Sequence, residues 1–173
     1  CQALPDEPLH SSFIMGRMAK AAKESGAVAI RAQGVEDIIE IKKVTELPVI
    51  GIIKGEYSDS EIYITPTKKE VEELSKTKCE MIALDATNRV RPNNESLEEI
   101  IKFIHELGIL VMADISTYEE AVNAQKLGCD CISTTLCGYT SYSENYDGPN
   151  LELIEKLTKE LDIPIIAEGK INT

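Results

Sequence analysis

Charged side chains follow directly after five of the six short apolar runs in this sequence. They are two cations and three carboxylates: Arg31, Lys54, Asp85, Asp114 and Glu168. Unbroken apolar runs suit strands buried on both faces, as in a parallel sheet covered by helices. The carboxyl ends of such strands share one edge, where barrels and open α/β sheets bind their ligands. A single strand-end charge usually marks only where the chain reaches solvent, but this repetition predicts a functional cluster.

Lys54 is the most informative member of this cluster. It follows the run PVIGII (48–53), so its aliphatic stem is expected to lie in apolar surroundings. Burial and a neighbouring Arg31 would both lower its pKa and leave a neutral amine that can act as a base. Glu168 would either be raised in pKa by burial or be held ionised by pairing with Lys54.

The apolar runs predict six strands, over residues 27–30, 48–53, 81–84, 109–113, 131–135 and 163–167. Segments of helical periodicity separate them, and in the first of these Phe13, Ile14 and Met18 mark the apolar stripe. Three capping boxes predict helix starts, at Thr67–Glu70, Ser96–Glu99 and Thr117–Glu120. Strands that alternate with helices indicate a parallel α/β fold, either a doubly wound sheet or a (β/α) barrel. The stretch Gly138–Asn150 is long enough to be a functional loop.

Composition and motifs exclude several classes of function. The chain has 173 residues, with 18 Lys+Arg against 30 Asp+Glu and a net charge of −12, which argues against nucleic acid or an anionic membrane as a partner. No glycine-rich phosphate loop follows a predicted strand, which disfavours nucleotide-binding folds. The three carboxylates have no histidine beside them, so no metal is expected. The five cysteines fit no zinc or redox spacing and indicate a reducing, cytoplasmic compartment.

The sequence resembles the N-acetylmannosamine-6-phosphate 2-epimerases of bacterial sialic-acid catabolism. The matching stretches occur in the right order along nearly the whole chain: CQAL (1–4), GRMAKAA (16–22), AIRAQGVEDI (29–38), PVIGIIK (48–54), ITPT (64–67), IALDATNRVRP (82–92), MADIST (112–117), ISTTLCGYT (132–140) and IAEGKINT (166–173). The resemblance implies a (β/α)8 TIM barrel of the phosphate-binding type. It also implies an isomerase that interconverts N-acetylmannosamine 6-phosphate and N-acetylglucosamine 6-phosphate without a cofactor.

The resemblance assigns roles to particular residues. It makes Lys54 the catalytic base and Glu168 its acidic partner, and it gives Gln2, Arg31 and Asp114 substrate-binding or orienting roles. Two loops would lie beside the sugar phosphate, through Gly138, Tyr139, Thr140, Gly169 and Lys170. The partner would be a small amino-sugar phosphate, and a homodimer is compatible with the family.

Two other functions are compatible with the predicted site. Lys54 could form a Schiff base in another sugar-phosphate barrel enzyme of the aldolase type, or the chain could bind a sugar phosphate without turnover.

A barrel of this class has eight strands, and the sequence predicts six. We therefore expect residues 1–173 to form one incomplete barrel domain. The body of the first strand would precede Cys1, and the eighth strand would follow Thr173.

Overall fold

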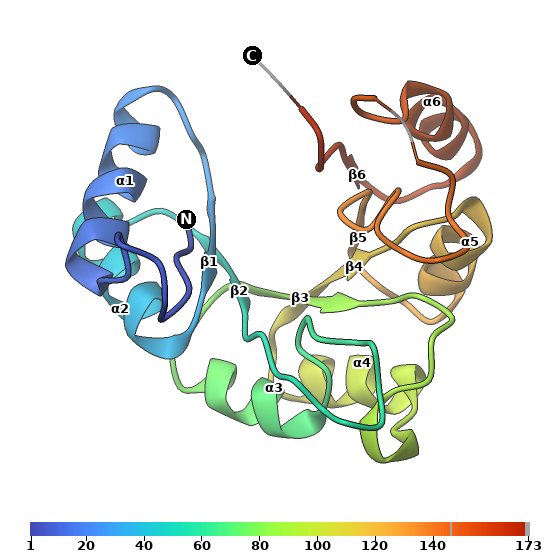
Figure 1. Ribbon diagram of the computed structural model, residues 1–173, viewed down its shortest axis with the longest axis horizontal. Helices are drawn as coiled ribbons and strands as arrows, with labels where there is room; N and C mark the ends of the chain where they lie inside the picture. The colour runs from blue at the N-terminus through green and yellow to red at the C-terminus, as the bar shows by residue number, and fades with distance from the viewer. Residues whose placement is uncertain (146, 172–173) are drawn as a thin grey trace.

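The chain forms one curved, parallel sheet with helices along its outer face, as the computed structural model shows (Figure 1). The structure describes residues 1–145 and 147–171. Tyr146, in the predicted long loop, and Asn172 and Thr173, at the end of the stretch 166–173, lie outside the described residues. The elements in chain order are α1 (Ser12–Glu24), β1 (Ile30–Gln33), α2 (Val35–Thr45), β2 (Val49–Ile52), α3 (Lys68–Ser75), β3 (Met81–Asp85), the 3-10 helix η1 (Pro92–Asn94), α4 (Leu97–Glu106), β4 (Leu110–Asp114), α5 (Tyr118–Lys126), β5 (Cys131–Ser133), α6 (Leu151–Glu160) and β6 (Ile165–Ile166).

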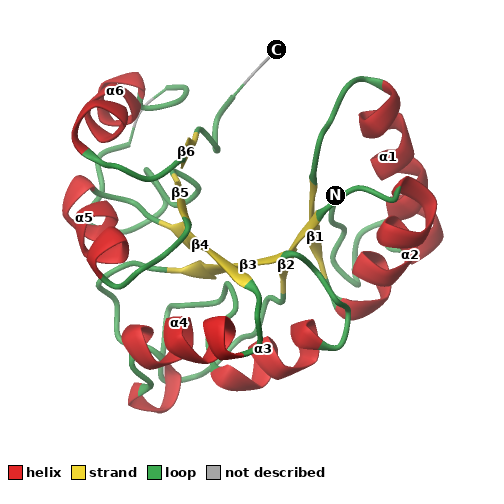
Figure 2. Ribbon diagram, turned by 180° about the vertical axis from the view of Figure 1, so that it is seen from behind, coloured by secondary structure: helices red, strands yellow, loops and turns green. Residues whose placement is uncertain are grey.

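The strand order identifies the architecture as that of a barrel. The six strands lie side by side in the order of the sequence, and every adjacent pair is parallel. A doubly wound sheet would reverse its strand order and carry helices on both faces. Here the helices lie on the outside of the curve, and within the described residues the sheet is open between β1 and β6 (Figures 1 and 2). The α/β barrel prediction is thus confirmed in the form of an open partial barrel.

Alternation along the strands separates a helix-facing core from an inner face. In β4, Val111 and Ala113 pack in the large core against the helices, whereas Met112 belongs to a small inner cluster. Because side chains alternate every residue along a strand, Asp114 faces inward with Met112. The same alternation holds in β2, β3 and β5, which contribute Ile52, Ala83 and Cys131 to the inner cluster.

Close packing of the outer face explains a glycine in β2. A Cβ atom on Gly51 would lie 3.0 Å from Leu74, and 3.1 Å from both Cys79 and Ile38. The backbone of β2 therefore approaches its covering helices more closely than a side chain would permit. This brings the strand that precedes Lys54 into a well-packed position.

The first predicted strand was placed too early in the sequence. β1 covers Ile30–Gln33 rather than residues 27–30, so Arg31 lies inside the strand and not after it. Gly26 has a φ of 99°, and the residues after it form the connection into the sheet, with Val28 82% exposed. The short apolar run therefore covers a loop and only the first residue of the strand.

Two helix predictions were also wrong in detail. In α1, Phe13 and Met18 are 61% and 43% exposed, while Met15 and Ala19 are buried, so the buried stripe is rotated from the predicted one. Thr67 and Thr117 begin complete capping boxes, but Ser96 makes no capping hydrogen bond. The side chain of Glu99 is instead 3.1 Å from Lys68. None of the described helices has both the length and the apolar character needed to cross a membrane.

Candidate active site

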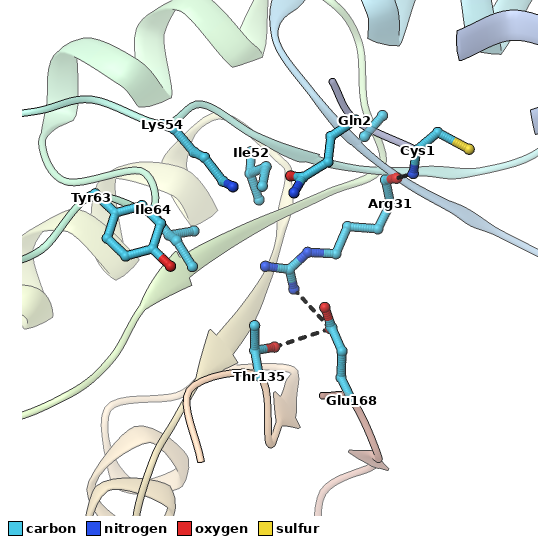
Figure 3. Close-up of a pocket in the computed structure, with 10 residues that line it drawn as sticks. Cys1, Gln2, Arg31, Ile52, Lys54, Tyr63, Ile64, Thr135 and Glu168 are labelled. Atoms are coloured by element: carbon cyan, nitrogen blue, oxygen red, sulfur yellow. Dashed lines mark hydrogen bonds and ion pairs between the residues drawn. The ribbon is translucent and has the colours of Figure 1, made fainter. Parts of the chain in front are cut away.

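The inner face of the sheet carries a cavity of about 350 Å³ that holds most of the predicted charged residues (Figure 3). Arg31 enters it from β1, Lys54 from just beyond β2, and Glu168 from just beyond β6. Arg31 points inward because its neighbours Ile30 and Ala32 pack in the helix-facing core. Lys54 lies two positions after Ile52 of the inner cluster, and Glu168 is separated by an odd number of positions from Ile165, which packs against the core. Gln2 also lines the cavity, with its amide directed into it.

An ion-pair network at the wall of this cavity links β1 to the end of β4 and to the segment after β6. Arg31 Nη1 donates to Asp114 Oδ1 at 2.8 Å, and Nη2 donates to Asp114 Oδ2 at 2.6 Å. Arg31 Nη1 also lies 3.2 Å from Glu168 Oε2. The Asp114 side chain is fully buried, so the two-fold contact offsets the cost of removing its charge from water.

Two hydroxyl groups complete the network around Glu168. Thr135 Oγ1 lies 2.9 Å from Asp114 Oδ1 and 3.0 Å from Glu168 Oε2. Ser133 Oγ donates to the same Glu168 oxygen at 3.0 Å. The backbone of Glu168 is held as well, because its N–H donates to Thr134 Oγ1 at 3.0 Å. This side chain is therefore fixed as a hydrogen-bond acceptor.

The pKa shifts distinguish Lys54, which can act as a base, from Arg31, which keeps its positive charge. Burial lowers the pKa of Lys54, and the positive charge of Arg31 lowers it further, as the sequence predicted. Burial would also lower the pKa of Arg31, but Asp114 and Glu168 raise it above its usual value. Burial raises the pKa of the Asp114 carboxyl against the opposing effect of Arg31. Pairing with Lys54 was one of two alternatives for Glu168, and it is absent from the described contacts, where Glu168 pairs with Arg31.

The predicted loop residues lie beside the cavity and do not line it. Gly138 and Gly169 both have positive φ, at 78° and 90°, and a Cβ on Gly169 would lie 3.9 Å from the Tyr139 ring. Lys170 Nζ is 5.5 Å from the centre of that ring and also contacts Asn145. The two loops are therefore neighbours.

Two predicted polar groups are turned away from the cavity. The Thr140 hydroxyl donates to Ser116 Oγ at 3.2 Å, in a buried position next to α5. Asp85 faces Asp114 in the register of β3 and β4, but its carboxylate binds Arg89 at 2.6 Å and does not line the cavity.

Among the residues that line the cavity, sequence reasoning missed the two with side-chain hydroxyl groups, Tyr63 and Thr135. Thr135 has a signal in the sequence, since it continues the inward alternation of Cys131 and Ser133. Tyr63 has none, because it lies on the connection between β2 and α3 and follows no apolar run. Within residues 1–145 and 147–171, no group of three or more His, Cys, Asp or Glu side chains is arranged to hold a metal ion.

The fold and this site define a class, the parallel α/β barrels with charged groups at the carboxyl ends of their strands. The solved 2-keto-3-deoxy-6-phospho-gluconate aldolase from Zymomonas mobilis shares the fold, with a TM-score of 0.61 and 14% identity over 95% of this chain and 69% of the aldolase chain. At that identity the likeness extends to the fold alone.

Closer relatives define the family. The family model "Putative N-acetylmannosamine-6-phosphate epimerase" matches residues 15–173, and the chain belongs to this family. A "Putative N-acetylmannosamine-6-phosphate 2-epimerase" of Clostridioides difficile (strain 630) is 73% identical over 173 residues, which are all of this chain and 78% of that protein. The solved N-acetylmannosamine-6-phosphate 2-epimerase from Clostridium perfringens is 66% identical with a TM-score of 0.98, over all of this chain and 76% of that one.

Proposed function

We propose that the chain is an isomerase that interconverts N-acetylmannosamine 6-phosphate and N-acetylglucosamine 6-phosphate by inverting C2, and that Lys54 is its base. The observation that carries the assignment of Lys54 is its position: a lysine with a lowered pKa faces the same cavity as Arg31 and Glu168. Inversion beside a carbonyl requires removal of the C2 proton and its return to the opposite face. A neutral amine suits the first of these steps.

In this proposal the proton passes from C2 to the Lys54 amine, and the electron pair moves onto the carbonyl oxygen at C1. A proton from the Lys54 ammonium, from Glu168 or from a substrate hydroxyl then returns to the other face of C2, and the carbonyl forms again. Exchange with solvent restores the neutral Lys54 amine and the proton donor. Figure 3 shows Lys54 and Glu168 on either side of the Arg31 guanidinium. Glu168 would accept a hydrogen bond from a substrate hydroxyl, and Gln2 would bind the substrate through its amide.

Arg31 and Asp114 would orient these groups. The guanidinium holds Glu168 in place at 3.2 Å, and the buried Asp114 holds the guanidinium through two short hydrogen bonds. The field of Arg31 also keeps Lys54 closer to its neutral form. Both effects act on residues that would touch the substrate.

The substrate phosphate would bind at the neighbouring loops that contain Gly138, Tyr139, Thr140, Gly169 and Lys170. Support comes from the position of Gly169, where a Cβ would lie 3.6 Å from the carbonyl oxygen of Thr135, a residue of the cavity. Backbone amides of such loops bind phosphate without a large positive charge, which suits a chain with a net charge of −12.

Incorporation of solvent deuterium at C2 of N-acetylglucosamine 6-phosphate, followed by proton NMR, tests the assignment. Lys54→Met keeps the apolar stem and removes the amine, so the exchange rate should fall about 10²- to 10⁴-fold. Lys43→Met, on the outer face with its side chain 74% exposed, is the matched control and should exchange at the wild-type rate.

Two results would contradict the proposal. Exchange by Lys54→Met at the wild-type rate would remove Lys54 from its role. Covalent trapping of the sugar phosphate on Lys54 by borohydride would instead support a Schiff-base mechanism of the aldolase type.

We also propose a cytoplasmic location and a homodimer. The location is supported by the cysteines, all of which are free thiols in the structure. The homodimer is supported by the family resemblance alone, and sedimentation of the purified protein tests it.

A further inference from the structure

Arg31 has already used most of its hydrogen-bonding capacity within the protein. A guanidinium has five N–H groups, and its contacts to Asp114 and Glu168 already use three of them. Its positive charge is likewise shared between two carboxylates. The oxygen that becomes negative when C2 loses its proton therefore needs another donor close to Lys54.

Tyr63 is placed to be that donor. It lines the same cavity as Lys54, and Lys54 Nζ lies 5.7 Å from the centre of its ring. Figure 3 shows its hydroxyl directed into the cavity, towards the Arg31 guanidinium. The hydroxyl makes no hydrogen bond to another described residue, whereas three other tyrosines bind carboxylates: Tyr57, Tyr118 and Tyr142.

The backbone on either side of the ring is held in place. Lys54 and Ile64 form an antiparallel bridge, and Gly55 N donates to the Tyr63 carbonyl at 2.9 Å. Asp85 N, at the end of β3, donates to the Ile64 carbonyl at 3.0 Å. The position of Tyr63 is thus tied directly to that of Lys54.

The segment after β3 holds the same connection from outside. Arg89 Nη1 donates to the Glu61 carbonyl at 3.4 Å, and Arg91 Nη1 donates to the Pro66 carbonyl at 3.0 Å. These contacts give a structural role to the motif NRVR (88–91) that the catalytic assignment leaves unused. Because the connection is already ordered, placing the phenol beside a substrate has little further entropic cost.

The phenol is also in the state that can donate. Burial raises the pKa of Tyr63, and the negative charges of Asp85 and Asp114 raise it further against the opposing effect of Arg89. The hydroxyl therefore keeps its proton near neutral pH.

We propose that Tyr63 is a further substrate-binding residue, whose phenol donates a hydrogen bond to the sugar oxygen that becomes negatively charged as Lys54 removes the C2 proton. This inference rests on the proposed function. The proton of C2 passes to the Lys54 amine, the electron pair moves to the C1 oxygen, and Tyr63 keeps its own proton throughout. The hydrogen bond forms when the substrate binds and strengthens as the charge develops.

Tyr63→Phe tests this by removing only the hydroxyl. Binding of N-acetylglucosamine 6-phosphate, measured by calorimetry, should weaken about 3- to 10-fold. The deuterium exchange rate at C2 under saturating substrate should fall further, about 10- to 100-fold. Tyr57→Phe is the control, because Tyr57 lies on the same connection but bonds Glu70 at 2.8 Å, and both of its values should stay within about 2-fold of wild type.

Each outcome decides the inference. Values for Tyr63→Phe within 2-fold of wild type, or an equal loss in Tyr57→Phe, would overturn it. If the wild-type protein binds the sugar phosphate but exchanges no deuterium, the proposed function fails, and the binding comparison still decides whether Tyr63 contacts the ligand. A wild-type protein that does not bind would overturn both.

Discussion

Replacing Arg31 with methionine would leave the buried Asp114 carboxylate without its cation. The two side chains meet through hydrogen bonds of 2.6 and 2.8 Å, and the Asp114 side chain is 0% exposed. Methionine fills most of the space of the arginine stem, so the main effect is the loss of the charge. Of the hydrogen bonds described for the carboxylate, the one to Thr135 would remain.

Removing one member of a buried ion pair costs about 3–5 kcal/mol, because the other charge stays buried and unpaired. Protonation of Asp114 sets a ceiling on that cost. With an unfolded-state pKa near 3.9, the ceiling is about 1.5 kcal/mol at pH 5 and about 5.6 kcal/mol at pH 8. The full cost is therefore expected at pH 8 and only part of it at pH 5.

The direction of this pH dependence follows from linkage. Burial already raises the pKa of Asp114, and without Arg31 nothing comparable opposes that shift. A carboxyl with a raised pKa binds more protons in the folded state than in the unfolded state, so acidification favours folding. The difference in stability between Arg31→Met and wild type should shrink as the pH falls from 8 to 5.

Urea unfolding at pH 5 and pH 8, with wild type measured beside each variant, provides the assay. Arg31→Met should lose about 3–5 kcal/mol at pH 8, and the double variant with Asp114→Leu should recover most of it. Lys68→Met, which removes an exposed pair with Glu99, should change stability by less than about 1 kcal/mol. A loss below about 1 kcal/mol in Arg31→Met at pH 8, or an equal loss at both pH values, would refute the reasoning.

Three further predictions concern the base, a buried cap and the packing of β2. The deuterium exchange rate should rise with pH and level off below pH 10.5, because burial and Arg31 lower the pKa of Lys54 from that value. A rate that falls between pH 7 and 9 would contradict the role of the neutral Lys54 amine as the base. Glu120→Ala should lower the free energy of unfolding by about 3 kcal/mol, because this buried carboxylate accepts hydrogen bonds from both Ser116 and Tyr142. Thermal unfolding measures the change, and Glu119→Ala, at an exposed position of the same helix, is the control. Gly51→Ala should lower the free energy of unfolding, measured in urea, by about 1–3 kcal/mol, because its Cβ would lie 3.0 Å from Leu74. An unchanged unfolding midpoint would show that the helices covering β2 shift to make room for the methyl group.

The fold was predictable where apolar runs are long and bulky. β2 to β6 all overlap the predicted runs, because Val, Ile and Leu favour both burial and extended backbone. The strand predicted over residues 27–30 was wrong, because the small side chains of Ala27 and Ala29 favour a strand less than the preceding Gly26 favours a turn. The strand order was not predictable from periodicity, since a doubly wound sheet and a barrel have the same alternation of elements.

The site was predictable where a charge ends a strand. Lys54 and Glu168 meet in one cavity because parallel strands align their carboxyl ends, and Arg31 joins them from inside β1, where alternation turns its side chain inward. Asp85 obeys the same rule but is bound by Arg89, four positions later in the loop after β3, and a strand pattern does not encode such a local pairing. Tyr63 depends on how a connection folds back over the sheet, which is set by hydrogen bonds between distant segments.

The ion pair between Arg31 and Glu168 links β1 to the residues just beyond β6, at the two edges of the sheet within the described residues. The two residues are 137 positions apart in the sequence, and the described ladders run from β1 to β6 without pairing these two strands to each other. Any flattening of the sheet would therefore stretch this contact first, before a backbone hydrogen bond is lost. The separation of the Arg31 and Glu168 side chains therefore follows the curvature of the sheet across the described residues.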